Sequence, residues 1–409
     1  MKKIAIVGGG AAGIFLGHLL SDLQVQVNIY EKDDKPLKKV LATGNGRCNF
    51  TNDYLSISDY QVEDEYKDGV AAILEAFDNR AMTALFDDLG MPSFSMESGR
   101  RYPNTLYSKT PVACLLNNIG KNINVIGSCE VKRIQDQDGA FRLETSRGSD
   151  HADIVVICTG GRMGIRKNDF SNGYDLAKAL GHRKTELFPG IVALKTKKTY
   201  PKMKNIKVKA KADLVVGGKV ISSIKDDVMF TDVGVSGLAI LQLSNLALWE
   251  LGKGKKVGVK LDLLPELEKE KIEDFIKEKA KRSPRFTVFQ VLEGFLQEKI
   301  IEGLLADLGI SKGLWIMKLR EDEISKIADR IKAFDLDVLG PKSFEDGQIT
   351  CGGIDLAGID LKSLESKGHK NLYFCGEVLD VQGESGGYNL QWAWSSAHRV
   401  FESIKKSVE

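Results

Sequence analysis

Six small residues near the start of the chain, Gly8-Gly9-Gly10-Ala11-Ala12-Gly13, have the types and spacing of a phosphate-binding turn. They match the G-x-G-x-x-G pattern at Gly8, Gly10 and Gly13. In that pattern the first glycine permits a tight turn, the second lets the backbone approach a pyrophosphate, and the third packs a helix on a strand. The free N–H groups that open the helix then face the anion. Alone the pattern is weak, so its setting must decide.

The setting of the glycine pattern is that of a dinucleotide-binding β-α-β unit. Residues 3–7 form a short apolar run typical of a buried parallel strand, and an apolar helix pattern continues to about residue 23. A second strand is expected over residues 25–30, and Glu31 and Lys32 follow it. An acidic residue at this point accepts hydrogen bonds from ribose hydroxyls. The sequence therefore predicts a bound dinucleotide with Glu31 on its adenosine ribose.

Later segments favour FAD over NAD as the tightly bound cofactor. A long glycine-punctuated loop spans residues 41–49, and a plain NAD dehydrogenase does not need it. Thr159-Gly160-Gly161 follows a buried-type strand and resembles the second flavin-associated turn of two-dinucleotide flavoproteins. Gly376-Glu377 follows another such strand, and Gly386-Gly387-Tyr388 precedes a helix. These last two segments resemble the part of a flavoprotein that covers the isoalloxazine ring.

The predicted FAD site draws on all of these segments. We expect the last helix to point the free N–H groups at its start toward the N1–O2 edge of the flavin, where the reduced anion carries charge. Two adjacent glycines there would leave the ring unobstructed, although a plain glycine cap is the alternative. The full set of expected cofactor-binding residues is Gly8, Gly10, Ala11, Ala12, Gly13, Glu31, Lys32, Gly44, Gly46, Arg47, Cys48, Asn49, Val131, Thr159, Gly160, Gly161, Gly376, Glu377, Asp380, Gly386, Gly387, Tyr388, Asn389 and Leu390.

Two neighbours in the 41–49 loop have competing interpretations. Arg47 suits a diphosphate contact because a guanidinium offers paired donors, and the alternative is a solvent-exposed loop arginine. Cys48 lies where disulfide reductases place a redox pair, but the residue five positions earlier is Thr43. A single cysteine cannot cycle as an intramolecular disulfide. We expect a packed thiol near the flavin, with the flavin performing the redox step and no side chain assigned as catalytic.

Composition excludes several classes of protein. The 409 residues suggest two or three domains, and 58 basic against 56 acidic residues give a net charge of +2, so we expect no nucleic-acid partner from bulk charge. The six cysteines are scattered without metal-like spacing, so we expect neither zinc nor disulfides. Glycines interrupt the apolar stretch 4–20, which is also short for a membrane span. We expect a cytoplasmic protein.

The texture of the chain changes near residues 190 and 345. A helix is expected over 69–90 before the first change, and the nucleotide-domain texture returns with a strand at 371–375 and an amphipathic helix from Gly386 to Lys405. We therefore predict an α/β protein with a Rossmann-like domain and an inserted β-plus-α domain, the active cleft lying between the latter and the flavin. The predicted domains are residues 1–189 with 346–409 and residues 190–345, the latter helical over about 264–335.

Eight lysines between Lys195 and Lys211 form the one notable charge run. In an alternating strand they point outward, and a solvated edge strand protected from aggregation explains them. The alternative is an RNA-binding face, as in FAD-dependent tRNA-modifying enzymes, which Lys281, Arg282 and Arg285 would extend. Little aromatic interleaving supports that face. An FAD-dependent RNA-modifying or RNA-binding protein thus stays the alternative function.

Three motifs in this order resemble those of the bacterial BaiN/YhiN-like, aminoacetone-oxidase-like family of FAD-binding oxidoreductases. They are GNGRCNFTN at 44–52, FTDVGVSG at 230–237 and GEVLDVQGESGGYNLQ at 376–391. The resemblance covers essentially the whole chain. It implies a glutathione-reductase-like FAD domain with an inserted β-barrel and helical domain. It also implies hydride transfer between flavin N5 and a small organic substrate or NAD(P)H.

The resemblance leaves the substrate open, since amine oxidation and reduction of steroid-like enones are both associated with the family. Two departures from the family pattern concern specificity. Leu238 stands where proline is expected, and residues 162–172 lack the usual Ser-Tyr-Pro and Gly-Ser-Thr-Gly-Asp sequences. The oligomeric state is not predicted.

Overall fold

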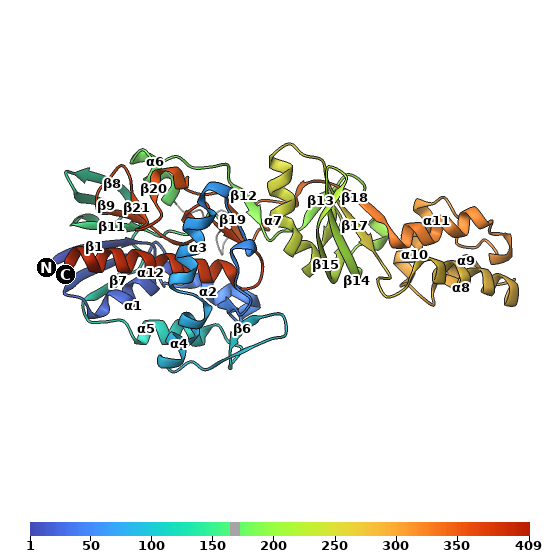
Figure 1. Ribbon diagram of the computed structural model, residues 1–409, viewed down its shortest axis with the longest axis horizontal. Helices are drawn as coiled ribbons and strands as arrows, with labels where there is room; N and C mark the ends of the chain where they lie inside the picture. Colours follow the sequence, from blue (N-terminus) through green and yellow to red (C-terminus); the bar gives the residue numbers. More distant parts are fainter. Residues whose placement is uncertain (164–171) are drawn as a thin grey trace. The chain divides into compact units, whose positions relative to one another are not determined.

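The computed structural model describes residues 1–163 and 172–409. The chain divides into two compact units. Unit 1 comprises Met1–Phe188 and Ile349–Glu409, and unit 2 comprises Pro189–Gln348 (Figure 1). The sequence texture had placed the corresponding boundaries at 189/190 and 345/346. The departure from the family pattern at 162–172 lies largely outside the described residues.

A seven-stranded sheet forms the centre of unit 1, in the order β20-β21-β22-β11-β1-β2-β7. The strands from β22 to β7 run parallel, and both ends of the chain contribute to them, because β11 pairs with β1 on one side and with β22 on the other. The strand expected at 371–375 therefore lies in the sheet that contains residues 4–7. The bounds are β1 (Lys2–Val7), β2 (Val25–Tyr30), β7 (Ile123–Ile126), β11 (Ile154–Ile157), β20 (Ile359–Asp360), β21 (Glu365–Ser366) and β22 (Leu372–Phe374).

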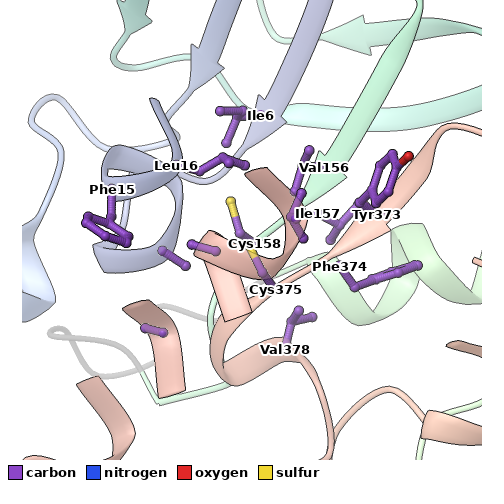
Figure 2. Close-up of a cluster of buried hydrophobic side chains, with 14 of the residues drawn as sticks. Ile6, Phe15, Leu16, Val156, Ile157, Cys158, Tyr373, Phe374, Cys375 and Val378 are labelled. Carbon is purple, nitrogen blue, oxygen red and sulfur yellow. The ribbon is translucent and has the colours of Figure 1, made fainter. Parts of the chain in front are cut away.

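The core of unit 1 lies where this sheet meets two helices, α1 (Ala11–Leu19) and α12 (Tyr388–Val408), which pack against each other (Figure 1). The edge of the Trp394 ring lies against Phe15, with the ring centroids 5.4 Å apart. Figure 2 shows side chains from β1, α1, β11 and β22 gathered in one cluster. Because α12 ends the chain, this core joins the first and last segments of the sequence.

Shorter elements surround this core. The helix expected over 69–90 is in fact two helices, because Asp78 interrupts it and accepts hydrogen bonds from the N–H groups of Arg80 and Ala81, both at 2.9 Å. This is an N-cap, which starts a new helix. The helices are α2 (Lys38–Ala42), α3 (Lys67–Ala76), α4 (Asn79–Asp88), α5 (Lys109–Asn117) and α6 (Gly173–Ala179). The strands are β3 (Thr51–Asn52), β4 (Tyr60–Gln61), β5 (Ser93–Ser95), β6 (Arg100–Pro103), β8 (Val131–Gln137), β9 (Ala140–Thr145), β10 (Gly148–Ala152) and β23 (Gln382–Gly383).

Unit 2 is built on a closed six-stranded barrel in the order β13-β16-β15-β14-β17-β18. Four helices lie between β17 and β18 in the chain, and α7 (Leu238–Gly252) follows β16. The strands are β13 (Leu194–Thr196), β14 (Lys207–Val216), β15 (Lys219–Phe230), β16 (Gly234–Ser236), β17 (Val257–Asp262) and β18 (Phe334–Pro341). The four helices are α8 (Lys269–Arg282), α9 (Val288–Leu292), α10 (Glu298–Asp307) and α11 (Glu321–Lys332). The chain passes between the units at β12 (Phe188–Gly190) and β19 (Ile349–Cys351).

The lysine-rich strand β14 is not an edge strand, so that explanation of the lysines is wrong. β14 pairs with β15 on one side and with β17 on the other, and the barrel is closed. The alternation itself is confirmed, since the lysines at 207, 209 and 211 are exposed while Ala210 and Ala212 are buried. Asp227 lies 2.6 Å from Lys207, and Asp213 lies 3.1 Å from Lys211. Neighbouring carboxylates therefore neutralise part of the run.

Among the described helices, none is long and apolar enough to cross a membrane.

Candidate functional site

In the glycine turn after β1, protein atoms occupy the space where Gly8 and Gly13 would carry a side chain, whereas this space is open at Gly10. A Cβ on Gly8 (φ +114°) would lie 2.6 Å from the carbonyl oxygen of Cys158, and one on Gly13 would lie 2.0 Å from that of Gly8. A Cβ on Gly10, in contrast, would have no atom within 4 Å. The first helical bond of α1 runs from Ile14 N–H to the Gly10 carbonyl (3.0 Å). The N–H groups before Ile14 have no acceptor within the helix, and an anion over Gly10 would meet them.

Glu31 closes this turn from the end of β2. Its carboxylate accepts hydrogen bonds from the N–H groups of Gly9 and Asp33, both at 2.8 Å. Burial raises the pKa of Glu31. Each carboxylate oxygen can accept more than one hydrogen bond. The bonds from Gly9 and Asp33 therefore leave room for ribose hydroxyls as further donors to Glu31. Lys32, beside it, is exposed. The structural role of Glu31 in holding the turn was not evident from the sequence.

Val131 lies near the same end of the site. The N–H of Cys129 donates to the backbone oxygen of Glu31 (2.8 Å), which fixes the start of β8 beside β2. The Val131 side chain is buried, and its carbonyl accepts from the side-chain amide of Asn172 (2.6 Å). Asn172 is a residue that the sequence interpretation missed, because nothing local marks it.

Three turns meet at the carboxyl ends of β1, β11 and β22. A Cβ on Gly8 would lie 2.9 Å from the Cα of Thr159, and one on Gly376 would lie 3.1 Å from the Cβ of Ala12. The hydroxyl of Thr159 is buried and has no hydrogen-bond partner within residues 1–163 and 172–409. The carboxyl ends of parallel strands are where open α/β sheets bind ligands. The structure thus brings together three of the predicted segments, at residues 8–13, 159–161 and 376–377.

Glu377 organises this meeting point. One carboxylate oxygen accepts from the N–H of Gly161 (3.1 Å) and pairs with the Lys39 ammonium (2.9 Å), and the other accepts from the N–H of Thr350 (2.9 Å). Its carboxylate is therefore engaged by the protein. Lys39 and Thr350 were missed by the sequence interpretation, since their link to Glu377 is purely spatial.

Asp380 lies deeper, and burial raises its pKa. It accepts a hydrogen bond from the side-chain amide of Gln382 (2.7 Å). The side-chain oxygen of Gln382 and the hydroxyl of Tyr174 are buried and have no hydrogen-bond partner among the described residues. Buried polar atoms are nearly always hydrogen-bonded, so such atoms mark places where water or a ligand completes the site. Gln382 and Tyr174 are further residues that no sequence pattern indicated.

The 44–49 loop has a left-handed backbone at several residues, among them Gly44, Gly46 and Cys48. A Cβ on Gly46 would meet no atom within 4 Å. Arg47 is exposed and has no ion pair within residues 1–163 and 172–409. Cys48 is fully buried, and burial raises its pKa to about 12. A thiol in that state is a poor nucleophile, which supports the packed-thiol interpretation.

The start of α12 faces this loop. Gly387 caps the helix with φ +100°, and a Cβ there would lie 2.4 Å from the carbonyl oxygen of Thr51 and 3.0 Å from Oδ1 of Asn49. β3 approaches Gly387 so closely that no side chain fits there, so this backbone contact itself requires glycine. Leaving room for the flavin ring is therefore not the reason for glycine at position 387. Oδ1 of Asn49 is buried and unpartnered. The amide of Asn389 donates to the carbonyl of Gly383 (2.7 Å), and Leu390 is half-buried.

These features fit FAD. The open position over Gly10 at a helix N-terminus suits a pyrophosphate, and the Glu31 carboxylate at the end of β2 offers an acceptor for hydroxyl groups. The second glycine-lined place, formed by the 44–49 loop and the start of α12, holds a helix N-terminus and an unpartnered amide oxygen. No group of three or more His, Cys, Asp or Glu side chains in the described part of the chain could hold a metal ion.

Comparison with known proteins gives full-length relatives. A 3-dehydro-bile acid delta(4,6)-reductase of Clostridium scindens is 29% identical over 402 residues, covering 97% of this chain and 98% of that protein. A ribosomal RNA dihydrouridine synthase of Haemophilus influenzae is 28% identical, with 98% of both chains covered. The corresponding protein of Escherichia coli is 27% identical, covering 96% of this chain and 95% of its own.

Among solved structures, a 3-ketosteroid delta1-dehydrogenase from Sterolibacterium denitrificans aligns over 100% of both chains with a TM-score of 0.47 and 10% identity. A flavocytochrome c3 fumarate reductase aligns over all of this chain and 78% of its own, with a TM-score of 0.46 and 13% identity. The profile of the HI0933-like protein Rossmann domain matches residues 2–402. The chain therefore belongs to the HI0933-like Rossmann family, which confirms the resemblance that the three motifs indicated.

Proposed function

We propose that this FAD-dependent oxidoreductase reduces a carbon–carbon double bond conjugated to a carbonyl group in a small organic substrate. The observation that carries the proposal is the full-length likeness to the bile-acid reductase and to the two dihydrouridine synthases. Their names describe saturation of such a bond, in an unsaturated keto steroid acid and in a uracil ring. A reduced nicotinamide is the proposed source of electrons.

The residues around the two glycine-lined sites would bind different parts of FAD. The turn from Gly8 to Gly13 and the start of α1 would bind the pyrophosphate, with Arg47 as a further donor. Glu31 would bind the ribose. FAD, when bound, supplies hydride exchange at N5. The glycine-capped start of α12 would stabilise negative charge on the reduced ring, because a helix N-terminus favours anions. The role of unit 2 as the substrate-side domain stays a prediction.

The test begins with the purified protein, which should be yellow with about one FAD per chain. Under anaerobic conditions NADH, NADPH, amines and thiols are each offered as reductants. We expect a reduced nicotinamide to bleach the flavin and a conjugated ketone, such as 2-cyclohexen-1-one or a 4-en-3-one steroid, to restore its colour. Bleaching by amines alone, with no reoxidation by any conjugated ketone, would contradict the proposal. Colourless protein that takes up no FAD would contradict the cofactor.

RNA as the substrate is a second candidate, and one surface of unit 2 favours it. Phe286 and Trp315 are 46% and 44% exposed, and the N–H of Ile316 donates to the Phe286 carbonyl (2.8 Å), so the two aromatic side chains come from adjoining segments. Lys281 and Arg285 nearby are also exposed. Exposed aromatic rings beside cations are typical of single-stranded nucleic-acid binding. Aromatic and basic side chains that do not alternate in the sequence are therefore found together on adjoining segments of unit 2.

Binding of a fluorescent single-stranded oligouridine tests this candidate. We expect affinity that falls steeply with salt and that drops about tenfold or more in a Phe286→Ala/Trp315→Ala variant, since stacking on one aromatic is worth about 1–3 kcal/mol. Trp249→Ala on α7 is a control for loss of a tryptophan elsewhere. Salt-independent or undetectable binding would eliminate the RNA candidate and leave the small-molecule proposal standing.

A further inference from the structure

Glu384 is fixed just before the two glycines that cap α12. The short strands β23 and β4 pair with Gly383 opposite Tyr60, and the N–H of Glu384 donates to the Asp59 carbonyl (2.9 Å). The Glu384 carbonyl accepts from the side-chain amide of Asn389 in the first turn of α12 (3.2 Å). The backbone of Glu384 is thus held on both sides, two residues from Gly386. These hydrogen bonds fix the position of the Glu384 backbone beside the start of α12.

The carboxyl of Glu384 is half-buried and makes no hydrogen bond or ion pair within the described residues. Its charged neighbour is another carboxyl, Asp59, which accepts from the N–H of Ser56 (2.8 Å). The other titratable groups nearby are Tyr60 on β4 and Tyr388 on α12, whose pKa values are raised by burial and by the adjacent Asp59 carboxylate. The positive charge of Arg100 on β6 offsets part of this rise at Tyr388. Burial, with the nearby Asp59 charge, raises the pKa of Glu384 to about 7. The acid form is therefore populated at neutral pH.

The other acids of the site are already engaged. The Glu31 carboxylate is bound by two backbone N–H groups, and that of Glu377 by Lys39 and two more. Asp380 is bonded to Gln382, and the Cys48 thiol is fully buried. Asp59 accepts from Ser56, so among the described acids beside the start of α12 Glu384 is the one whose carboxyl has no hydrogen-bond partner.

We propose that Glu384 is the proton donor in the reduction, an inference that rests on the proposed function. Hydride adds to the β-carbon of the conjugated bond from reduced flavin, whose two electrons come from the reduced nicotinamide. The π electrons of the double bond form a new C–H bond at the α-carbon with the proton of Glu384, whose O–H bond breaks. The product is the saturated carbonyl compound, and the Glu384 carboxylate regains a proton from water.

The test separates the two halves of the reaction in the holoenzyme. The flavin of wild type, E384Q and the surface control E75Q on α3 is reduced anaerobically with NADPH or dithionite and then mixed with 2-cyclohexen-1-one. We expect equal FAD content and equal reduction by dithionite in all three. Reoxidation by the enone should fall at least about 100-fold in E384Q alone, the usual contribution of a positioned acid. In wild type this rate should decline as pH rises through about 7, and E384Q should lose that decline.

A second readout needs no substrate. The folded pKa of Glu384 lies above its ordinary value, so ionisation in the folded protein opposes stability as pH rises toward and through about 7. Wild type should therefore melt below E384Q at pH 8 and beside it at pH 5, whereas E75Q follows wild type throughout. E384Q that reoxidises at the wild-type rate with the wild-type pH profile would overturn the donor role alone. Wild-type enzyme that no conjugated ketone reoxidises would overturn the proposed function and the donor role with it, while the melting data still report on Glu384.

Discussion

The two units treat buried polar groups differently. In unit 1, four site residues (Asn49, Thr159, Tyr174 and Gln382) bury a polar side-chain atom that has no partner. In the described part of unit 2 the one such atom is Nε of Arg330. That guanidinium is otherwise engaged, since its NH2 lies 2.6 Å from Asp307 and its plane lies over the Phe334 ring at 4.1 Å. Nδ1 of His398 and Nε of Arg399 on α12 are also unpartnered, but within the described residues the unpartnered atoms of the candidate site all lie in unit 1.

Both units contain glycines whose Cβ position is filled by protein and glycines whose Cβ position is open. In unit 2 a Cβ on Gly234 would lie 2.2 Å from the Leu194 carbonyl, so the barrel itself fills the space. In unit 1 the open positions at Gly10 and Gly46 lie on the two loops that we assign to FAD. Gly46 has φ +80°, which itself favours glycine, whereas Gly10 has φ −79° and no protein atom beside it, so close approach of a ligand would explain Gly10. Variants can test this contrast.

The largest effect is expected for Gly13→Ala. Its Cβ would meet the Gly8 carbonyl at 2.0 Å and the Cys158 sulfur at 2.9 Å. Overpacking against backbone should cost at least about 3 kcal/mol of unfolding free energy. Gly10→Ala is the matched control, because its Cβ meets no protein atom. It should melt like wild-type apoprotein yet bind FAD at least about tenfold more weakly. Equal FAD affinity in Gly10→Ala, measured by titration, would show that the open position is not the pyrophosphate site.

The next effect is expected in unit 2 for Asp307→Asn. The Asp307 carboxylate, whose side chain is 7% exposed, pairs with Arg330 and Lys198. Removing one partner of a buried pair costs about 3–5 kcal/mol, and we expect about 2–3 because Lys198 is largely exposed. Asp329→Asn on α11, whose partner is Lys269 at the surface, should cost less than about 1 kcal/mol. Chemical denaturation of both variants measures this, and FAD affinity should be unchanged in each. A loss of FAD affinity in Asp307→Asn would contradict the separation of roles.

Glu31→Ala should weaken FAD binding about 10- to 100-fold, because a hydrogen bond to a charged acceptor is worth about 1.5–3 kcal/mol. The N–H groups of Gly9 and Asp33 also lose their acceptor, so the apoprotein should melt at a lower temperature than wild type. Glu31→Gln keeps one acceptor oxygen, so its FAD affinity and melting temperature should lie between those of wild type and Glu31→Ala. Titration of apoprotein with FAD measures the affinity. If Glu31→Ala binds FAD as wild type does, Glu31 serves only the turn.

The smallest effect is a pH dependence in unit 2. Burial raises the pKa of Asp307, but pairing with Lys198 and Arg330 lowers it by more, so the pKa lies below its ordinary value. Such a carboxylate contributes stability above its unfolded pKa of about 3.9 and loses it as pH falls through the folded pKa. The stability gap between wild type and Asp307→Asn should therefore narrow on acidification below about pH 4. A gap that widens instead would mean that the pair does not form in solution.

Much of the fold and of the glycine turn could be predicted because both depend on local pattern. The turn at Gly8 to Gly13 and the strands beside it lie within one β-α-β unit, where periodicity is informative. The partners of Glu377 could not be predicted, because Lys39 and Glu377 are 338 positions apart and no periodicity joins them. The edge assignment of β14 failed for the same reason, since only the pairing of distant strands closes the barrel.

The placement of β22 between β11 and β21 has a consequence for the newly made chain. Val155 pairs with Leu372, so one edge of β11 stays unpaired until residues 372–374 have been synthesised. Unit 2 is contiguous, and all of its contacts are available earlier. During that interval the apolar edge of β11 is unpaired, and an unpaired edge invites aggregation. We therefore expect the first part of unit 1 to depend most on chaperones in the interval before β22 is added.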